Sequence, residues 1–210
     1  MKEPRFIVLE GGEGVGKTVQ TKLLSKYLSS LNIEHIISRE PGGSPSAEKI
    51  RDILVKGRPD DLNAISELLL MSASRSEHVR QTIKPALVSN KWIICDRYYH
   101  SSLAHQHYAS GLDINLVKDV TKHAIDKTEP DIVLILDIPA DLGIERSLAK
   151  MSTATEKRFE GKSLKYHADV RKGYLEMENT MDNVVIINAD QTPEEVHANI
   201  IIELKNKGIV

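Results

Sequence analysis

The sequence predicts an α/β fold in which a five-stranded parallel sheet carries helices on both faces. Apolar runs of strand length recur along the chain, and longer segments with helical spacing of apolar residues separate them. The runs are continuous rather than alternating, which is typical of strands that are buried on both faces. They lie at 6–9, 33–37, 92–95, 132–136 and 184–187.

The turn between the first strand and the first helix fits the phosphate-loop pattern G-x-x-x-x-G-K-[ST] at every fixed position. Its residues are Gly11, Gly12, Glu13, Gly14, Val15, Gly16, Lys17 and Thr18. Backbone N–H groups of such a loop bind phosphates, a lysine reaches the terminal ones, and the threonine hydroxyl holds Mg²⁺. The pattern predicts a P-loop NTPase fold with a nucleoside triphosphate site. It does not name the reaction, because kinases, GTPases and motor ATPases share it.

Length, charge and composition limit the possible classes of protein. A chain of 210 residues fits a single domain, 1–210, with 151–162 as a mobile insert. The net charge is −2, and two Phe and one Trp offer few stacking surfaces, so we expect no nucleic-acid or membrane partner. The single cysteine, Cys95, lies in an apolar run and is typical of a core. Without a secretory segment or a membrane-spanning run, we expect a cytoplasmic protein.

Charged side chains follow three of the predicted strands at the edge where parallel strands end. The second strand runs into Glu40 and Pro41, the third into Asp96 and Arg97, and the fourth into Asp137. Open α/β sheets bind ligands at this edge. Asp96 is placed as a water-mediated Mg²⁺ ligand or a catalytic base, and Arg97 suits bidentate phosphate contact. The alternatives are a plain strand-to-helix turn at Glu40 and an ion pair that caps the third strand.

The helices before the third strand carry further polar candidates. Arg51 lies off the apolar face of its helix, where a solvated charge is the usual explanation. Met71 and Arg75 share one face of a long helix that we expect Pro85 to kink rather than end. Met71 is typical of a core, whereas Arg75 requires a planar polar partner. After the third strand, serines at 101–102 are also typical helix N-caps.

The stretch 151–162 is polar and charged, and we expect it to be a flexible basic lid. Arg146 and Lys150 precede it and Arg158 lies within it. Phosphoryl transfer needs such a lid, because water that reaches the activated phosphate would hydrolyse it. The alternative is an ordinary exposed loop. The last strand and the amphipathic helix at 193–204 carry no candidate function.

Several blocks of sequence, in order along nearly the whole chain, resemble a thymidylate (dTMP) kinase of the bacterial type. The blocks are 11–18, 39–43, 73–75, 96–98, 101–104 with Gln106, and 158–160. The resemblance implies a single nucleoside monophosphate kinase-like domain that transfers the γ-phosphoryl group of Mg-ATP to dTMP, giving dTDP and ADP for dTTP synthesis. It also implies a homodimer. The alternatives are another nucleoside monophosphate or deoxynucleoside kinase and, from another class, a P-loop switch ATPase.

Two observations weigh against these alternatives. Arg75 only donates hydrogen bonds, so it matches thymine O4 and would face the amino group of cytosine. A switch ATPase has no need for Arg51, Arg75 and Arg97 around a second pocket, and no N-K-x-D guanine signature is visible.

The resemblance implies a role for each matched position. Lys17 and Thr18 serve ATP and Mg²⁺, and Asp96 serves the metal and its waters. Arg51 and Arg97 grip the acceptor phosphate, and Glu13 meets the sugar 3′-OH. The remaining residues that line the dTMP pocket or contact its base are Glu40, Pro41, Arg75, Ser101, Ser102 and Gln106. The basic residues that stabilise the transferring phosphoryl group come from the lid region, and the candidates are Arg146, Lys150 and Arg158.

The chain departs from the family's pattern at two positions. The family usually has Phe stacked on thymine where this chain has Met71, and a thioether still packs against a π face. The family usually has Tyr close to C2′ of the sugar where this chain has His105. Imidazole is smaller and offers both a donor and an acceptor, so it leaves room for a ribose 2′-OH.

Overall fold

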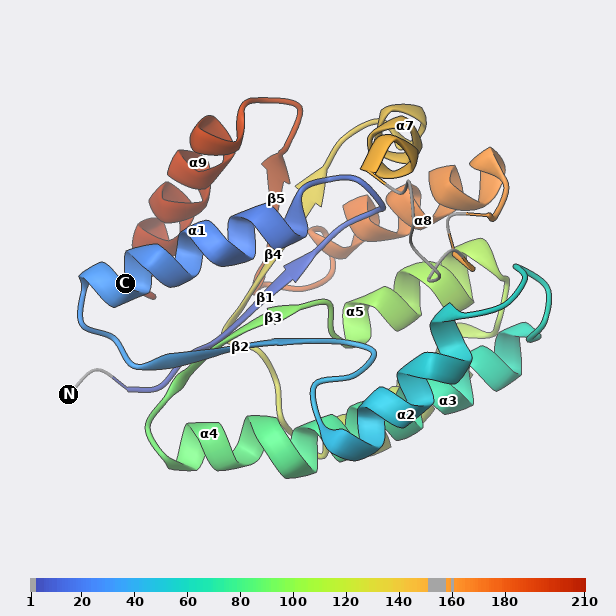
Figure 1. Cartoon of the computed structure of the whole chain (residues 1–210), viewed down its shortest axis with the longest axis horizontal. Helices are drawn as coiled ribbons and strands as arrows, with labels where there is room; N and C mark the ends of the chain where they lie inside the picture. The colour runs from blue at the N-terminus through green and yellow to red at the C-terminus, as the bar shows by residue number, and fades with distance from the viewer. Residues whose placement is uncertain (1–2, 151–157, 160) are drawn as a thin grey trace.

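The computed structural model describes residues 3–150, 158–159 and 161–210. A single five-stranded sheet runs through it in the order β2-β3-β1-β4-β5, and every neighbouring pair is parallel. This confirms the predicted α/β fold with helices on both faces (Figure 1). The strands are β1 (Phe6–Glu10), β2 (His35–Arg39), β3 (Trp92–Asp96), β4 (Ile132–Asp137) and β5 (Val184–Asn188).

The helices fall on the two faces of this sheet. The α-helices are α1 (Lys17–Ser30), α2 (Pro45–Val55), α3 (Ala64–His78), α4 (Lys84–Val88), α5 (Tyr99–Ser102), α6 (Ile114–Ile125), α7 (Ala140–Lys150), α8 (Leu164–Met177) and α9 (Pro193–Asn206). Two segments are wider, π-helical turns. η1 (Val79–Ile83) lies between α3 and α4, and η2 (Leu103–Ala109) follows α5. Pro85 stands in the first turn of α4, so the helical path continues past it as expected. Among the described residues, none of the helices has the length and apolarity needed to cross a membrane.

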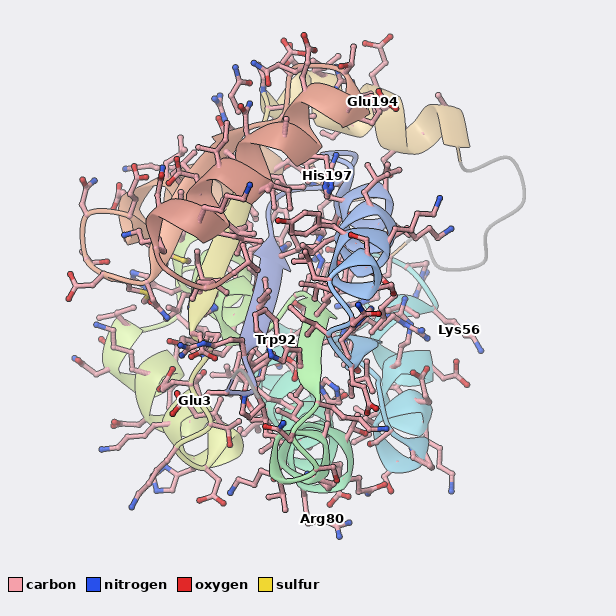
Figure 2. The ribbon with its side chains drawn as sticks, turned by 90° about the vertical axis from the view of Figure 1, so that its left-hand side faces the viewer. Glu3, Lys56, Arg80, Trp92, Glu194 and His197 are labelled. Atoms are coloured by element: carbon pink, nitrogen blue, oxygen red, sulfur yellow. The ribbon has the colours of Figure 1, made fainter. Side chains whose placement is uncertain are left out.

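Alternate residues of the central strand, β1, point into two separate hydrophobic cores. Phe6 and Val8 of β1 pack with side chains from α3, α6 and α8, whereas Ile7 and Leu9 pack with those of α1 and α9. Figure 1 shows α1 and α9 on one side of the sheet and α3 and α4 on the other. Figure 2 shows Trp92 of β3 inside the molecule. Burial on both faces explains why the strands are continuous apolar runs.

The second strand begins later than its apolar run predicts. The run covers 33–37, but β2 covers His35–Arg39, with His35 opposite Trp92 and Arg39 opposite Asp96. This edge strand pairs only with β3, so the register of its partner decides its ends, and it exposes Ile37.

The sheet order places the phosphate loop at the centre of the molecule. The chain leaves β1 for β3 and β2 on one side and returns to β4 and β5 on the other. Crevices form at such reversals, outside the carboxyl ends of the strands. The loop also requires a glycine by sterics, because a Cβ at Gly14 would lie 2.0 Å from the carbonyl oxygen of Gly143 in α7.

Candidate active site

The phosphate loop holds its lysine in a dry position. Lys17 is the first residue of α1, and its Nζ donates to the carbonyl oxygens of Gly11 at 3.0 Å and Gly12 at 2.7 Å. Burial lowers the pKa of Lys17, and the nearby Arg97 lowers it further. An ammonium held over the loop in this way is placed to meet phosphate oxygens.

Thr18 and Asp96 come together from α1 and the end of β3. The Thr18 hydroxyl donates to Oδ2 of Asp96 over 3.4 Å. Among the described residues, no group of three or more His, Cys, Asp or Glu side chains is arranged to hold a metal ion. One hydroxyl and one carboxylate suit Mg²⁺, because this ion keeps most of its ligands as water and phosphate oxygens.

Two cavities meet beside this loop. The outer cavity lies along residues 13–19 and includes Asp96. The inner cavity extends toward α3 and the α5–η2 segment. Four charged residues line both cavities, and they are Glu13, Glu40, Arg51 and Arg97. The other predicted residues that line the inner cavity are Pro41, Met71, Arg75, Ser101, Ser102, His105, Gln106 and Arg158.

Arg97 and Glu13 form the wall between the cavities. Arg97 has a left-handed backbone with φ of 71°, which turns its side chain back across the phosphate loop. Its guanidinium donates to Glu13 at 2.6 Å, to the carbonyl oxygen of Gly11 at 3.0 Å and to the Tyr174 hydroxyl at 3.1 Å. Burial opposes ionisation of Glu13, but Arg97 and Lys17 prevail and lower its pKa to about 2. Glu13 is therefore a carboxylate at neutral pH.

Glu10, the last residue of β1, supports this wall, and sequence reasoning missed it. Its carboxyl group is fully buried and accepts from the backbone N–H of Tyr98 at 2.7 Å. It also accepts from the hydroxyls of Ser101 at 2.8 Å and Tyr174 at 2.9 Å. Burial raises the pKa of Glu10. An acid directly before the glycine loop was a visible signal, whereas nothing local marks Tyr174 of α8.

Arg75 finds its planar partner in Glu40. Its Nε donates to Oε2 of Glu40 at 2.7 Å, and its Nη atoms donate to Ser102 Oγ at 3.0 Å and to the Tyr98 carbonyl oxygen at 3.2 Å. The side chain is 1% exposed and lines the inner cavity. The guanidinium is thus held rigidly beside the cavity.

A chain of buried hydrogen bonds continues from Glu40. Its Oε1 lies 3.0 Å from His78 Nδ1, and His78 Nε2 lies 2.6 Å from Ser38 Oγ. A carboxylate only accepts, so His78 carries its proton on Nδ1. Sequence reasoning missed His78 and Ser38, because their partnership joins α3 to β2 over 40 residues.

His105 faces Tyr166 of α8. Its Nδ1 lies 2.9 Å from the Tyr166 hydroxyl, and the ring of Phe159 stands edge-on to it at 5.9 Å. Burial, with Arg97 nearby, lowers the pKa of His105 to about 3, while burial raises the pKa of Tyr166. Tyr166 therefore donates to a neutral imidazole, and His105 keeps its own proton on Nε2.

Part of the predicted lid, 151–157 and residue 160, lies outside the described residues, as does the side chain of Lys150. Arg158 is fully buried in the inner cavity, forms an ion pair with Glu67 and donates to the Leu54 carbonyl oxygen at 3.0 Å. Arg146 donates to Asp190 at 2.8 Å and lines a separate groove beside residues 14–16. The structure therefore does not bring Arg146 and Arg158 together.

Arg51 of α2 reaches the junction of the two cavities. Its Nη1 donates to the Pro41 carbonyl oxygen at 2.8 Å, so the turn after β2 holds it there. Arg51 and Arg97 are the two guanidinium groups among the described residues that line both cavities. Such a pair suits a phosphate that enters from the inner cavity and meets a second one on the loop.

Comparison with known proteins gives a consistent result. The family model described as thymidylate kinase matches residues 9–200. A thymidylate kinase of Magnetococcus marinus is 40% identical over 207 residues, covering 98% of both chains. One of Syntrophotalea carbinolica is 42% identical, covering 91% of this chain and 90% of its own. The crystal structure of thymidylate kinase from Ehrlichia chaffeensis superposes with a TM-score of 0.79 at 31% identity, covering 97% of this chain and 100% of that one.

Proposed function

Because the chain belongs to the thymidylate kinase family, we propose that it transfers the γ-phosphoryl group of ATP to the 5′-phosphate of dTMP, giving dTDP and ADP. The observation that carries this proposal is the junction of two cavities at Glu13, Glu40, Arg51 and Arg97. A phosphoryl donor and a phosphate acceptor must meet in line, and two adjoining cavities that share Arg51 and Arg97 suit that geometry. The relatives do not favour the other kinases or the switch ATPase considered above.

The donor nucleotide occupies the outer cavity in this proposal. Its phosphates lie on the backbone N–H groups of residues 11–18, and Lys17 meets the terminal ones. Thr18 and Asp96 would hold Mg²⁺, which would supply positive charge beside the phosphates. The groove beside residues 14–16, which Arg146 also lines, extends to Ala189 and Pro193 and suits the remainder of ATP.

The acceptor occupies the inner cavity, with its phosphate between Arg51 and Arg97. Glu13, held ionised by Arg97, is placed to accept from a sugar hydroxyl. Arg75 points donors at the base, Met71 and Pro41 supply apolar contact, and Ser101, Ser102 and Gln106 complete the polar lining. No covalent step on the protein is needed, because positioning and charge neutralisation account for phosphoryl transfer.

We assign to the lid region the basic charge that stabilises the transferring phosphoryl group. Arg146, Lys150 and Arg158 are the candidates, within a mobile lid at 151–162. For Arg158, this role requires that its guanidinium leave Glu67 when the lid closes. We also propose a cytoplasmic homodimer with a single domain per chain.

The test is a coupled assay of ADP formation with a panel of acceptors, namely dTMP, dUMP, dCMP, UMP and dGMP, and no acceptor. We expect dTMP to give the highest kcat/KM and chelation of Mg²⁺ to stop the reaction. ADP formation that is independent of acceptor would indicate a switch ATPase instead. A higher kcat/KM for another monophosphate would replace dTMP as the substrate.

A further inference from the structure

A buried carboxylate on α3, Glu67, enters the mechanism above only as the partner of Arg158. It is 2% exposed, and its two oxygens have different partners. Oε1 forms the ion pair with Arg158, and Oε2 accepts from Gln106 Nε2 at 3.3 Å. Burial of an ionised carboxyl group is costly unless it is paired, and Arg158 provides the pairing.

This contact decides which way the Gln106 amide points. A carboxylate accepts hydrogen bonds and cannot donate them, so it binds the NH₂ end of an amide and rejects the carbonyl end. Gln106 lines the inner cavity, and its Oε1 makes no hydrogen bond to any described residue. Glu67 therefore leaves the carbonyl oxygen of Gln106 as the group that a ligand meets.

Gln106 and Arg75 act on the same part of the cavity. Arg75 donates to Ser102 Oγ, and Ser102 lies one helical turn before Gln106 along the α5–η2 segment. The cavity thus presents guanidinium donors beside one amide acceptor. Thymine and uracil offer the complementary edge, a carbonyl acceptor at O4 beside the N3–H donor. Cytosine offers the reverse, an amino donor beside an N3 acceptor, so both contacts fail.

We propose that Glu67 is a positioning residue that fixes the Gln106 carbonyl oxygen toward the base and so selects thymine and uracil over cytosine. The inference rests on the proposed dTMP phosphorylation, with the base in the inner cavity. Glu67 acts through Gln106 and touches no substrate. Its contact with Gln106 uses Oε2, the carboxylate oxygen that Arg158 does not bind.

The test is Glu67→Gln, which keeps the shape and offers both a donor and an acceptor to Gln106. We expect the ratio of kcat/KM for dTMP over dCMP to fall about tenfold, in the range that one reversed polar contact gives. The KM for ATP should stay at the wild-type value. Arg158→Lys is the matched control, because it disturbs the same ion pair and keeps the cation beside Glu67. Arg158 is also a candidate in phosphoryl transfer, so kcat should change for both substrates together, while the ratio for dTMP over dCMP should stay at the wild-type value.

Two further variants separate positioning from damage to the fold. If Glu67→Gln does not fold, the double variant Glu67→Gln/Arg158→Met removes both buried charges and is measured in its place. In a Gln106→Leu background, Glu67→Gln should leave the ratio unchanged, because no amide remains to be oriented. A folded Glu67→Gln protein with the wild-type ratio would overturn the proposal. An equal fall in the Gln106→Leu background would overturn it as well.

Calorimetry of dTMP and dCMP binding without ATP keeps this inference distinct from the proposed function. The ratio of the two Kd values should also fall about tenfold in Glu67→Gln. A wild-type protein that binds dTMP over dCMP but forms no dTDP would contradict the proposed reaction and leave the inference to the Kd ratio. A ratio that Glu67→Gln leaves unchanged would contradict the inference alone.

Discussion

Each charged side chain at this site has several hydrogen-bond partners. Burial and the neighbouring charges together determine its protonation state. Arg97 shows this best, because it contacts the loop, Glu13, Ser101 and Tyr174 at once. Groups constrained in this way need little reorganisation when a substrate arrives, which is the condition for strong electrostatic catalysis. Three predictions follow from individual residues.

Lys17→Ala should abolish phosphoryl transfer while the fold stays intact. The ammonium lies over the loop and bonds to the carbonyl oxygens of Gly11 and Gly12, outside both hydrophobic cores. We expect kcat to fall by about 10²–10³-fold, as for loss of one charge-stabilising donor. Steady-state kinetics measure the loss, and thermal unfolding checks the fold. Turnover within about tenfold of wild type would contradict the phosphate-loop assignment.

Glu13→Gln should make the unfolding free energy depend less strongly on pH in the acid range. The folded pKa of Glu13 is about 2, below its ordinary value of 4.5, so its pairing with Arg97 stabilises the fold fully above about pH 4.5. That contribution declines as pH falls toward 2, because the unfolded chain binds the proton first. Urea unfolding between pH 2 and 5 should show a shallower decline of the unfolding free energy in Glu13→Gln. An identical decline would mean that Glu13 is not held ionised.

His105→Tyr should raise the preference for deoxyribose. Neutral His105 bonds to Tyr166 through Nδ1, keeps a donor at Nε2 and lines the inner cavity, where an imidazole leaves more room for a 2′-OH than a tyrosine does. The ratio of kcat/KM for dUMP over UMP should be higher in the tyrosine variant, by about 1–3 kcal/mol in free energy. Tyr166→Phe is the companion variant, because it frees the imidazole and fills no space. An unchanged ratio in His105→Tyr would place His105 away from the sugar.

At the scale of elements, hydrogen bonds hold the turn after β2 against both α3 and η1. Gly42 N–H donates to Ser74 Oγ at 3.1 Å, and Thr82 Oγ1 donates to the Gly43 carbonyl oxygen at 2.7 Å. The same turn carries Glu40, which holds Arg75. A change in the turn therefore reaches the inner cavity through Glu40.

Gly43→Ala should disturb this arrangement. A Cβ there would lie 2.5 Å from both His78 Nε2 and Ser38 Oγ, at a backbone φ of +83°. We expect a loss of about 1–3 kcal/mol in unfolding free energy and a rise in the KM for dTMP larger than that for ATP. Gly111→Ala is the matched control, since its φ is +75° and nothing lies within 4 Å of the added atom. Equal effects of the two variants on the KM for dTMP would contradict this arrangement.

The sequence predicts those features of the fold and the site that a local pattern of residues encodes. The strands, the phosphate loop and the residues after each strand follow from hydrophobic spacing and a contiguous motif. The ion pair of Glu67 with Arg158 and the bond of His78 to Ser38 join residues 91 and 40 positions apart, so no local pattern marks them. The bounds of β2 could not be predicted either, because the register of its partner strand, β3, determines them. The burial of Arg158 depends on contacts with α2 and α3, so no local pattern marks it either.

At the scale of the whole molecule, three neighbouring helices carry exposed apolar side chains. They are Ile53 of α2, Ile65 and Leu69 of α3, and Leu116 of α6. α3 packs against both α2 and α6, so the three helices are neighbours. Exposed apolar side chains on adjacent elements are typical of association surfaces. The exposed apolar side chains of α2, α3 and α6 are our candidate for the contact in the proposed homodimer.

Leu69→Glu should therefore shift the protein toward monomer. The Leu69 side chain is 54% exposed in the single chain, so the substitution costs little within it, and a glutamate would be buried unpaired in the dimer. Light scattering over a concentration series measures the mass. Leu148→Glu on α7, with 56% exposure, is the control. A dimer that Leu69→Glu leaves intact would move the contact elsewhere.

The wall of Glu13 and Arg97 has a consequence for the binding equilibria. Both cavities contact the same two charged groups, so a nucleotide in one cavity changes the field and hydrogen bonds that the other nucleotide meets. The two affinities are then linked thermodynamically, and linkage is reciprocal. If an ATP analogue changes the Kd for dTMP by a given factor, dTMP changes the Kd for the analogue by the same factor.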